Sequence, residues 1–502
     1  MRVSMGSYIL AIDQGTTGTT ALLIDNVLNI HGKVNHEFPQ HFPKPGWVEH
    51  DLDEIWRSVL KAVDDVFETS KISPKEVIAI GITNQRETTC LWKRDDTGTA
   101  LGKAIVWQDR RTADFCGKLK SLGLERKIQK KTGLLLDPYF SASKIQWRLK
   151  QDASLLSLAK QGKVCFGTIE SFLLYRMSGE HKTDVTNASR TLLMDLKNCE
   201  WDDDLLRLFK VPKSMLPPIC DSSVLYGKTK NFGKLPDGIP ITGMIGDQQA
   251  ALFGQACFEK GAAKCTYGTG AFALLNTGKT PVFSKHGMLT TVSWKFKNQV
   301  VYGLEGSAFI AGAAVQWLRD GLGLFERSAD IENLATSVED CGGVVFVPAL
   351  SGIGAPHWIP GATGLLTGLT RGTSEAHIAR ATLEGIAFQV NELLRAMAKD
   401  ANAKLNPVKV DGGASESNFL MQFQSDISQI PVIRSRIIET TALGAGLQAG
   451  LGIGFWSGLE EITQKWKAER SFSSQMSAQK RKEKTASWDR AIKAVRLLSA
   501  GK

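Results

Sequence analysis

Residues 8–25 read YILAIDQGTTGTTALLID, and the polar centre of this stretch has the composition of a phosphate-binding turn. The apolar runs Tyr8–Ile12 and Ala21–Ile24 each have the length of a buried strand. Glycines let backbone N–H groups approach oxyanions, hydroxyls add donors, and Asp13 at the strand end can hold Mg²⁺ through water. A polar surface hairpin is the alternative, and this stretch alone does not decide between the two.

A second turn of the same kind lies half a chain later. Residues 262–277 read AAKCTYGTGAFALLNT, with Gly268-Thr269-Gly270 between two apolar runs. This spacing indicates two similar domains that each offer a Gly/Thr turn to a shared cleft, although such turns are common enough to coincide. We predict a boundary near residue 252, which gives an N-terminal domain of residues 1–252 and a C-terminal domain of residues 253–502.

Charged side chains follow two further expected strands. Asp247 comes directly after the apolar run 239–246 and precedes a helix, so it is either a catalytic carboxylate at a strand tip or the N-cap of that helix. Arg86 and Glu87 end the strand expected over 77–85 and supply a donor fork beside an acceptor; a surface ion pair is the alternative. Strands alternate with amphipathic helices such as 51–70, which predicts an α/β architecture.

Composition excludes several classes of function. The 502 residues are 43% hydrophobic and carry a net charge of +10, yet Lys and Arg are spread along the chain outside the run QKRKEK at 479–484. No aromatic residues interleave with that run, so we expect no nucleic-acid partner. The eight Cys show no ligand spacing for zinc, and no Walker A loop is present. Neither a signal peptide nor an apolar run of membrane-spanning length occurs, so we expect a cytoplasmic protein without membrane insertion.

Seven motifs in unbroken order resemble the FGGY carbohydrate kinases of the actin-like ATPase superfamily, and among them the glycerol kinases. The motifs are IDQGTTGTT, ITNQRETT, TNASRTLLMDL, GDQQAALFGQ, YGTGAF, VDGGASESN and ETTALGAG. The resemblance implies an α/β fold with two actin-like (ribonuclease H-like) ATPase domains flanking a deep cleft. It also implies ATP-dependent phosphorylation of glycerol to sn-glycerol 3-phosphate in glycerol catabolism, and a homodimer or homotetramer.

The resemblance assigns roles to residues of this sequence. Asp247 is the implied catalytic base. The implied glycerol-binding residues are Arg86, Glu87, Trp107, Tyr139, Asp247, Gln248 and Phe272. The implied ATP- or ADP-binding residues are Thr16, Thr17, Gly18, Thr269, Gly312, Gln316, Gly412, Gly413 and Ser417. Mg²⁺ is expected on Asp13 through water, with Asp247 as a second candidate ligand.

One departure from the family pattern keeps other functions open. The family's first turn commonly continues to an Arg, and Thr20 stands at that position. The chain therefore has two alternatives to a glycerol kinase: another FGGY polyol or sugar kinase, or a catalytically impaired actin-like sensor. Asp13, Asp247 and both Gly/Thr turns argue against the sensor.

A regulatory segment also departs from the family. Some bacterial members bind fructose 1,6-bisphosphate through a Gly-Arg loop, and some are switched by phosphorylation of a His there. The matching segment, 226–240, contains neither Arg nor His. We predict that fructose 1,6-bisphosphate leaves the rate of ADP release unchanged, because the anion has no guanidinium to bind; inhibition at micromolar concentration would contradict this.

Overall fold

The stretch that opens the chain folds as the expected hairpin in the computed structural model, which describes residues 6–359 and 361–500. Strands β1 (Tyr8–Gln14) and β2 (Gly18–Ile24) pair antiparallel, and the Gly/Thr turn joins them. β3 (Ile30–Glu37) extends this meander, while β5 (Val77–Asn84) pairs in parallel with β1, and β14 (Pro240–Gly246) pairs in parallel with β5. The order of the six-stranded sheet is β13-β14-β5-β1-β2-β3, with β13 (Ser223–Lys228) antiparallel at the edge.

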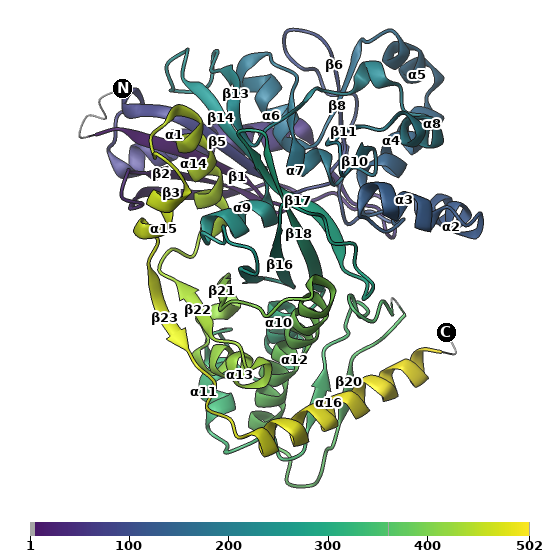
Figure 1. Ribbon diagram of the computed structural model, residues 1–502, viewed down its shortest axis with the longest axis vertical. Helices are drawn as coiled ribbons and strands as arrows, with labels where there is room; N and C mark the ends of the chain where they lie inside the picture. Colours follow the sequence, from purple (N-terminus) through teal and green to yellow (C-terminus); the bar gives the residue numbers. More distant parts are fainter. Residues whose placement is uncertain (1–5, 360, 501–502) are drawn as a thin grey trace.

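The C-terminal half repeats this arrangement. Its seven-stranded sheet has the order β17-β18-β16-β15-β21-β22-β23. β15 pairs antiparallel with β16 across the second Gly/Thr turn, and β21 and β22 add in parallel on the other side of β15. The strands are β15 (Ala263–Tyr267), β16 (Ala271–Gly278), β17 (Leu289–Phe296), β18 (Gln299–Ala308), β21 (Val408–Asp411), β22 (Val432–Ser435) and β23 (Ala468–Phe472). The predicted pair of similar domains is therefore present as two sheets of matching topology (Figure 1).

Helix α1 (Leu52–Ser70) covers one face of the first sheet. Asp51 accepts hydrogen bonds from the amides of Asp53 and Glu54, which caps the helix N-terminus. The apolar side chains on its inner face are all buried; they are Ile55, Val59, Ala62, Val63 and Val66. Burying this stripe against the sheet is what holds the helix in place.

Two helices cover the other face of the same sheet, and they come from the two halves of the chain. α9 (Asp247–Gly254) follows β14 directly, whereas α14 (Thr440–Ile453) belongs to the C-terminal half (Figure 1). Glycines permit their close approach, because a Cβ on Gly444 would overlap the carbonyl oxygen of Ala250, and one on Gly254 would overlap that of Thr440. The small residues of ETTALGAG thus serve helix packing. The predicted boundary at residue 252 falls inside α9 and stays a prediction.

The remaining elements surround the two sheets. Five small two-stranded sheets are present among the described residues: β4 (Glu49–His50) with β7 (Ala104–Ile105), β6 (Cys90–Lys93) with β8 (Val164–Gly167), β9 (Thr183–Asp184) with β12 (Ile219–Cys220), β10 (Met194–Asp195) with β11 (Glu200–Trp201), and β19 (Val345–Val347) with β20 (Leu365–Thr367). The other α-helices are α2 (Ala113–Ser121), α3 (Glu125–Thr132), α4 (Ser141–Gln151), α5 (Ala153–Lys160), α6 (Ile169–Ser178), α7 (Val185–Ala188), α8 (Asp203–Phe209), α10 (Gly312–Asp320), α11 (Asp330–Thr336), α12 (Glu375–Ala401), α13 (Asn418–Ser428), α15 (Leu459–Lys465) and α16 (Ala478–Ser499).

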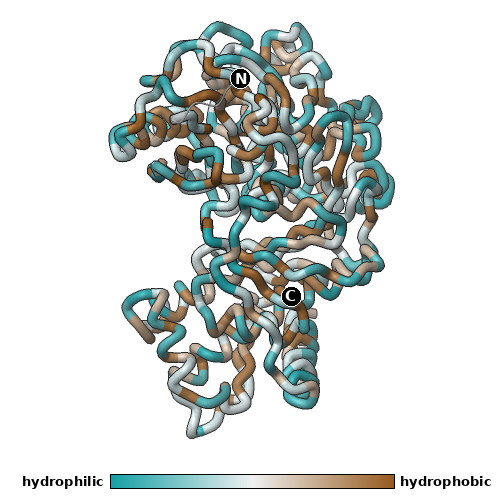
Figure 2. The backbone as a smooth tube through the Cα atoms, turned by 60° about the vertical axis from the view of Figure 1, so that its left-hand side comes forward, coloured by the Kyte–Doolittle hydropathy of each residue, from teal (hydrophilic) through white to brown (hydrophobic). Residues whose placement is uncertain are grey.

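Hydrophobic segments run through the interior of both lobes, and hydrophilic loops lie outside them (Figure 2). The long helix α12 contributes its apolar side chains to the core of the second lobe. The basic run 479–484 forms the first turns of α16 and is largely exposed. Within the described part of the chain, no helix combines the length and apolar character that crossing a membrane requires.

The crossing of α9 and α14 generates a stability prediction. Gly444→Ala places a methyl group against the Ala250 carbonyl, so we expect it to lower the free energy of unfolding by about 1–3 kcal/mol, as overpacking does. Gly117→Ala is the matched control, since Gly117 also lies in a helix but has no atom near its Cβ position; it should raise stability by up to about 1 kcal/mol. Chemical denaturation of both variants checks this, and equal effects would contradict it.

Candidate active site

The candidate catalytic residues meet where three parallel strands end. Asp13 is next to the last residue of β1, Arg86 and Glu87 lie just beyond β5, and Asp247 directly follows β14. Because β1, β5 and β14 are parallel and in register up to these tips, the three loops lie at the same edge of the sheet. Open α/β sheets bind ligands at this edge.

Asp247 has one carboxylate oxygen engaged and one available. Its Oδ1 lies 2.9 Å from Nε of Arg86 and accepts a hydrogen bond of 2.6 Å from the backbone N–H of Gln248. Among the described residues, nothing pairs with Oδ2, and the side chain is 29% exposed. The carboxylate is therefore fixed in orientation by Oδ1 and can accept a proton at Oδ2.

Arg86 and Glu87 belong to a buried group of four charges, here called the charge quartet: Arg86, Glu87, Arg190 and Glu305. Glu305 of β18 binds Arg86 through both carboxylate oxygens, at 2.5 and 2.9 Å, and lies 2.9 Å from Nη2 of Arg190. Nε of Arg190 lies 2.6 Å from Oε1 of Glu87. No member is more than 3% exposed, so each charge depends on its partners in place of water.

The quartet controls the protonation of its own members. Although burial alone would raise it, the charges of Arg190 and Arg86 lower the pKa of Glu305 to about 2. Burial opposes ionisation of Arg86, yet Glu305, Glu87 and Asp247 raise its pKa well above the ordinary value. At Glu87, by contrast, burial outweighs the charges of Arg190 and Arg86 and raises the pKa of the carboxyl. The ion pair with Glu305 and the contact with Asp247 hold the Arg86 guanidinium in place.

Two of the three aromatic residues expected to bind glycerol are in contact. The Trp107 and Tyr139 rings pack edge to face with centroids 5.5 Å apart, and Nε1 of Trp107 donates a 3.0 Å hydrogen bond to Oγ1 of Thr16. Trp107 is thereby tied to the first Gly/Thr turn. Burial raises the pKa of the Tyr139 phenol, which keeps it protonated and able to donate. Phe272 is half-buried on β16, at the start of the second sheet's hairpin.

The two Gly/Thr turns differ in the hydrogen bonds that their backbone groups make. In the first, the amide of Gly15 donates to the carbonyl of Gly18 at 2.8 Å, and the Thr17 side chain is exposed. In the second, the carbonyl of Thr269 accepts from the amides of Ala311 and Ala313 at 2.8 and 3.0 Å. The second turn is therefore fastened to the N-terminus of α10, whose amides would otherwise lack partners.

Asp13 has the features of a cation ligand. Burial, reinforced by the charge of Asp247, raises the pKa of Asp13 to about 7, and no described side chain or amide donates to its carboxylate. No cluster of three or more His, Cys, Asp or Glu residues with metal-ligand geometry occurs in the described regions. A carboxylate pair without a complete protein cage fits Mg²⁺, which keeps several waters and binds one or two carboxylates together with substrate phosphates.

A cavity of about 450 Å³ lies in the C-terminal lobe and collects most of the residues expected to bind nucleotide. Thr269, Gly312, Gln316, Gly413 and Ser417 all line it. Gly412 is not among the lining residues, but its positive φ of 85° and the closeness of Tyr267 to its Cβ position explain why a glycine is needed there. Thr16, Thr17 and Gly18 lie outside this cavity, on the other lobe.

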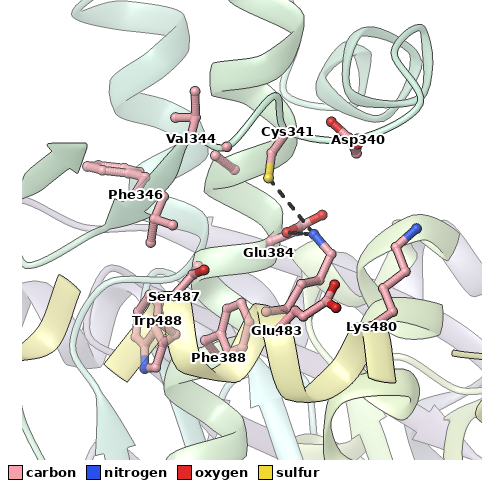
Figure 3. A pocket seen from close by; sticks show the side chains of 15 residues that line it. Asp340, Cys341, Val344, Phe346, Glu384, Phe388, Lys480, Glu483, Ser487 and Trp488 are labelled. Carbon is pink, nitrogen blue, oxygen red and sulfur yellow. Dashed lines mark hydrogen bonds and ion pairs between the residues drawn. The ribbon is translucent and has the colours of Figure 1, made fainter. Parts of the chain in front are cut away.

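A second cavity, of about 230 Å³, lies between α12, α16 and the loop before β19 (Figure 3). Apolar side chains, including Phe346, Phe388 and Trp488, line it beside the ion pair of Lys484 with Glu384, whose atoms are 2.6 Å apart. No predicted site residue is among those that line it, in the part of the chain that the structure describes. It is separate from the candidate active site.

The paired sheets, the strand-tip carboxylates and the lobe that carries the nucleotide-sized cavity are those of a carbohydrate kinase. Residues 8–254 match the N-terminal domain, and residues 263–453 the C-terminal domain, of the FGGY family of carbohydrate kinases. The chain belongs to this family, which confirms the expected fold of two actin-like domains.

Known relatives identify the branch of the family that the chain is similar to. It is 53% identical to a glycerol kinase of Myxococcus xanthus, covering 97% of this chain and 98% of that protein. It is also 53% identical to one of Bdellovibrio bacteriovorus, covering 98% and 100%. A crystal structure of Plasmodium falciparum glycerol kinase with ADP is 38% identical and superposes with a TM-score of 0.91, covering 97% and 98% of the two chains.

Sequence reasoning did not assign a role to three residues that the structure places in the site. Arg190 lies within the quoted motif TNASRTLLMDL, whereas Glu305 and Lys264 each interrupt an apolar strand. A charged residue in the middle of a buried strand is a signal in itself, because an unpaired buried charge is costly. The signal indicates that the buried charge has a partner, but it does not identify which residue that partner is.

The charge quartet generates a prediction about stability. Arg190→Met leaves Glu87 and Glu305 with one cation between them, and we expect a loss of about 3–5 kcal/mol in unfolding free energy. The exposed surface pair of Arg207 with Asp204 provides the control, since Arg207→Met should leave the unfolding free energy almost unchanged. Chemical denaturation measures both, and an Arg190→Met protein as stable as the control variant would show that the quartet is not a stabilising unit.

Proposed function

We propose that the protein transfers the γ-phosphoryl group of ATP to a terminal hydroxyl of glycerol, giving sn-glycerol 3-phosphate and ADP. The observation that carries this is the placement of Asp247: its Oδ1 is held by Arg86, its Oδ2 is available, and Gln248 follows it at the same strand tip. The relatives named glycerol kinase over nearly the whole chain support the choice of substrate.

The residues around Asp247 suit a three-carbon polyol. The Arg86 guanidinium and the Glu87 carboxylate offer donors and an acceptor to adjacent hydroxyls, and Tyr139 adds a phenol. The edge-to-face pair of Trp107 and Tyr139 would cover the hydrocarbon side of glycerol, with Phe272 of the other lobe completing the wall. A three-carbon polyol is short enough to contact all of these groups at once.

The reaction needs alignment more than covalent help. A hydroxyl oxygen of glycerol forms a bond to the γ-phosphorus while the bond from that phosphorus to the β–γ bridging oxygen breaks, and ADP leaves with the electron pair. The hydroxyl proton passes to Oδ2 of Asp247, the oxygen that Arg86 and the Gln248 amide leave available. Arg86 keeps the carboxylate oriented toward the hydroxyl.

ATP would bind between the two Gly/Thr turns. Thr16, Thr17 and Gly18 would donate to the phosphates from one lobe and Thr269 from the other, with the nucleoside in the 450 Å³ cavity beside Gly312, Gln316, Gly412, Gly413 and Ser417. Asp13, and Asp247 as a second ligand, would hold Mg²⁺ through water; the ion would neutralise phosphate charge when bound.

Thr20, which replaces the Arg common in the family, lies directly across the hairpin from Asp13. Its Oγ1 accepts a 2.9 Å hydrogen bond from Nδ2 of Asn35, so this position is polar but carries no charge. Both turns and Asp247 remain in place around it, which favours an active kinase over a sensor. A homodimer or homotetramer, a cytoplasmic location and the boundary between residues 252 and 253 stay predictions.

The decisive measurement is coupled ADP release from the purified protein with Mg-ATP. We expect release that depends on glycerol and exceeds that with xylulose, gluconate, dihydroxyacetone or no acceptor. Asp247→Asn keeps the size of the side chain but removes the proton acceptor, so it should lower glycerol-dependent turnover by about 100-fold or more.

Other results would change the proposed substrate or contradict the proposed reaction. Faster release with another polyol would keep the mechanism and replace glycerol as the substrate. Release that does not depend on any acceptor, or an Asp247→Asn variant as fast as the unaltered protein, would contradict the proposed reaction.

A further inference from the structure

Lys264 is a fully buried lysine beside the candidate active site. It lies on β15 of the C-terminal sheet, and its ammonium group donates to Oε1 of Gln248 and, at 2.9 Å, to Oγ1 of Thr266. Gln248 lies in the first turn of α9, next to Asp247. A side chain from one lobe therefore holds a candidate substrate-binding side chain of the other.

The cation is unusual in having no anion in contact. Within the described residues, no carboxylate lies within ion-pair distance of its Nζ, so two neutral oxygens are its recorded partners. A buried charge without a counter-ion is costly, and a methionine of similar length would avoid that cost. Stability alone thus gives no reason to keep a lysine here. Burial lowers the pKa of Lys264, although the charges of Asp411, Asp247 and Glu305, which lie near the ammonium without contacting it, act in the opposite direction.

Lys409 provides a comparison within the same sheet. It is the cross-strand partner of Lys264 on β21, and its ammonium donates at 2.6 Å to the carbonyl of Gln255 at the C-terminus of α9. That carbonyl end carries the negative pole of the helix, so Lys409 has an ordinary stabilising role as a helix cap. Lys264 meets the opposite end of α9, where a positive charge opposes the dipole and stabilisation by capping is absent.

We propose that Lys264 is a positioning residue that fixes the carboxamide of Gln248 with its oxygen toward the lysine and its NH₂ group toward the substrate. An ammonium can only donate hydrogen bonds, so the amide oxygen must face it. The amide NH₂ then remains as a donor for a glycerol hydroxyl. Without Lys264, the carboxamide can rotate and present its oxygen instead, and this donor is lost for part of the time.

The same contact links the lobes. Gln249 of α9 also bonds across, since its Nε2 donates at 3.2 Å to Oγ1 of Thr291 on β17. Gln255 donates at 2.7 Å to Oδ2 of Asp411 on β21. Of these three contacts between the lobes, the one made by Lys264 involves Gln248, the residue expected to bind substrate. The inference rests on the proposed function, because it requires that Gln248 bind the polyol.

The test is a double-mutant cycle with Lys264→Met and Gln248→Ala, read by calorimetric titration of glycerol and by coupled ADP release. We expect Lys264→Met to weaken glycerol binding by about twofold, if the carboxamide then adopts both orientations equally, to about tenfold, if the donor is lost altogether, while the KM for ATP stays unchanged. In the Gln248→Ala background, Lys264→Met should have no further effect on glycerol binding, because its target is gone.

Two further variants complete the experiment. Lys409→Met should lower the thermal midpoint and leave glycerol affinity unchanged, which separates loss of a buried lysine from loss of positioning. Lys264→Gln retains a neutral donor, so its glycerol affinity should fall between those of the unaltered protein and Lys264→Met. If Lys264→Met does not fold, Lys264→Gln replaces it in the double-mutant cycle.

The outcomes separate the two proposals. If the unaltered protein binds no glycerol, the proposed function fails before any variant is compared. If it binds glycerol and Lys264→Met changes only the KM for ATP, or weakens glycerol binding equally with and without Gln248, the lysine does not act through the carboxamide and the inference is overturned.

Discussion

The buried charge quartet is the constraint on which the site depends. Arg86 and Glu87 come from the tip of β5, Arg190 from the segment after α7, and Glu305 from the sheet of the other lobe. Each charge is out of water, so the separate segments are stable only when all four meet. The quartet therefore brings two lobes and three distant parts of the chain to one point, and it fixes the guanidinium that orients Asp247.

Helix α9 makes a second set of contacts between the lobes. It follows β14 of the first sheet, yet its glutamines bond to strands of the second: Gln248 to β15, Gln249 to β17 and Gln255 to β21. Its outer face packs against α14 through glycines that allow the backbones to touch. Motion of one lobe relative to the other must therefore strain or rearrange contacts at the helix that carries Asp247, which suits an enzyme that closes around its substrates.

The Gly/Thr turns of the two sheets are held in place by different elements. The first Gly/Thr turn lies beside Asp13, and the hydrogen bond from Trp107 to Thr16 ties this turn to the ring pair of Trp107 and Tyr139. The second is fastened to α10 and opens onto the nucleotide-sized cavity. In the proposed function, one topology used twice would provide a polyol side and a nucleotide side, and the transferred phosphoryl group would lie between them.

The sequence by itself determined the local structure and the strand-tip residues. The hairpin around Asp13, the helix 51–70, the strand before Asp247 and the paired Gly/Thr turns all follow from apolar periodicity and turn chemistry, which act over a few residues. Tertiary structure alone decided that Glu305 and Arg190 join Arg86, that Lys264 faces Gln248, and that α14 crosses back to the first sheet. These contacts join residues far apart in the chain, and an isolated charge in an apolar strand shows only that a partner exists, because which residue meets it depends on how the two sheets pack.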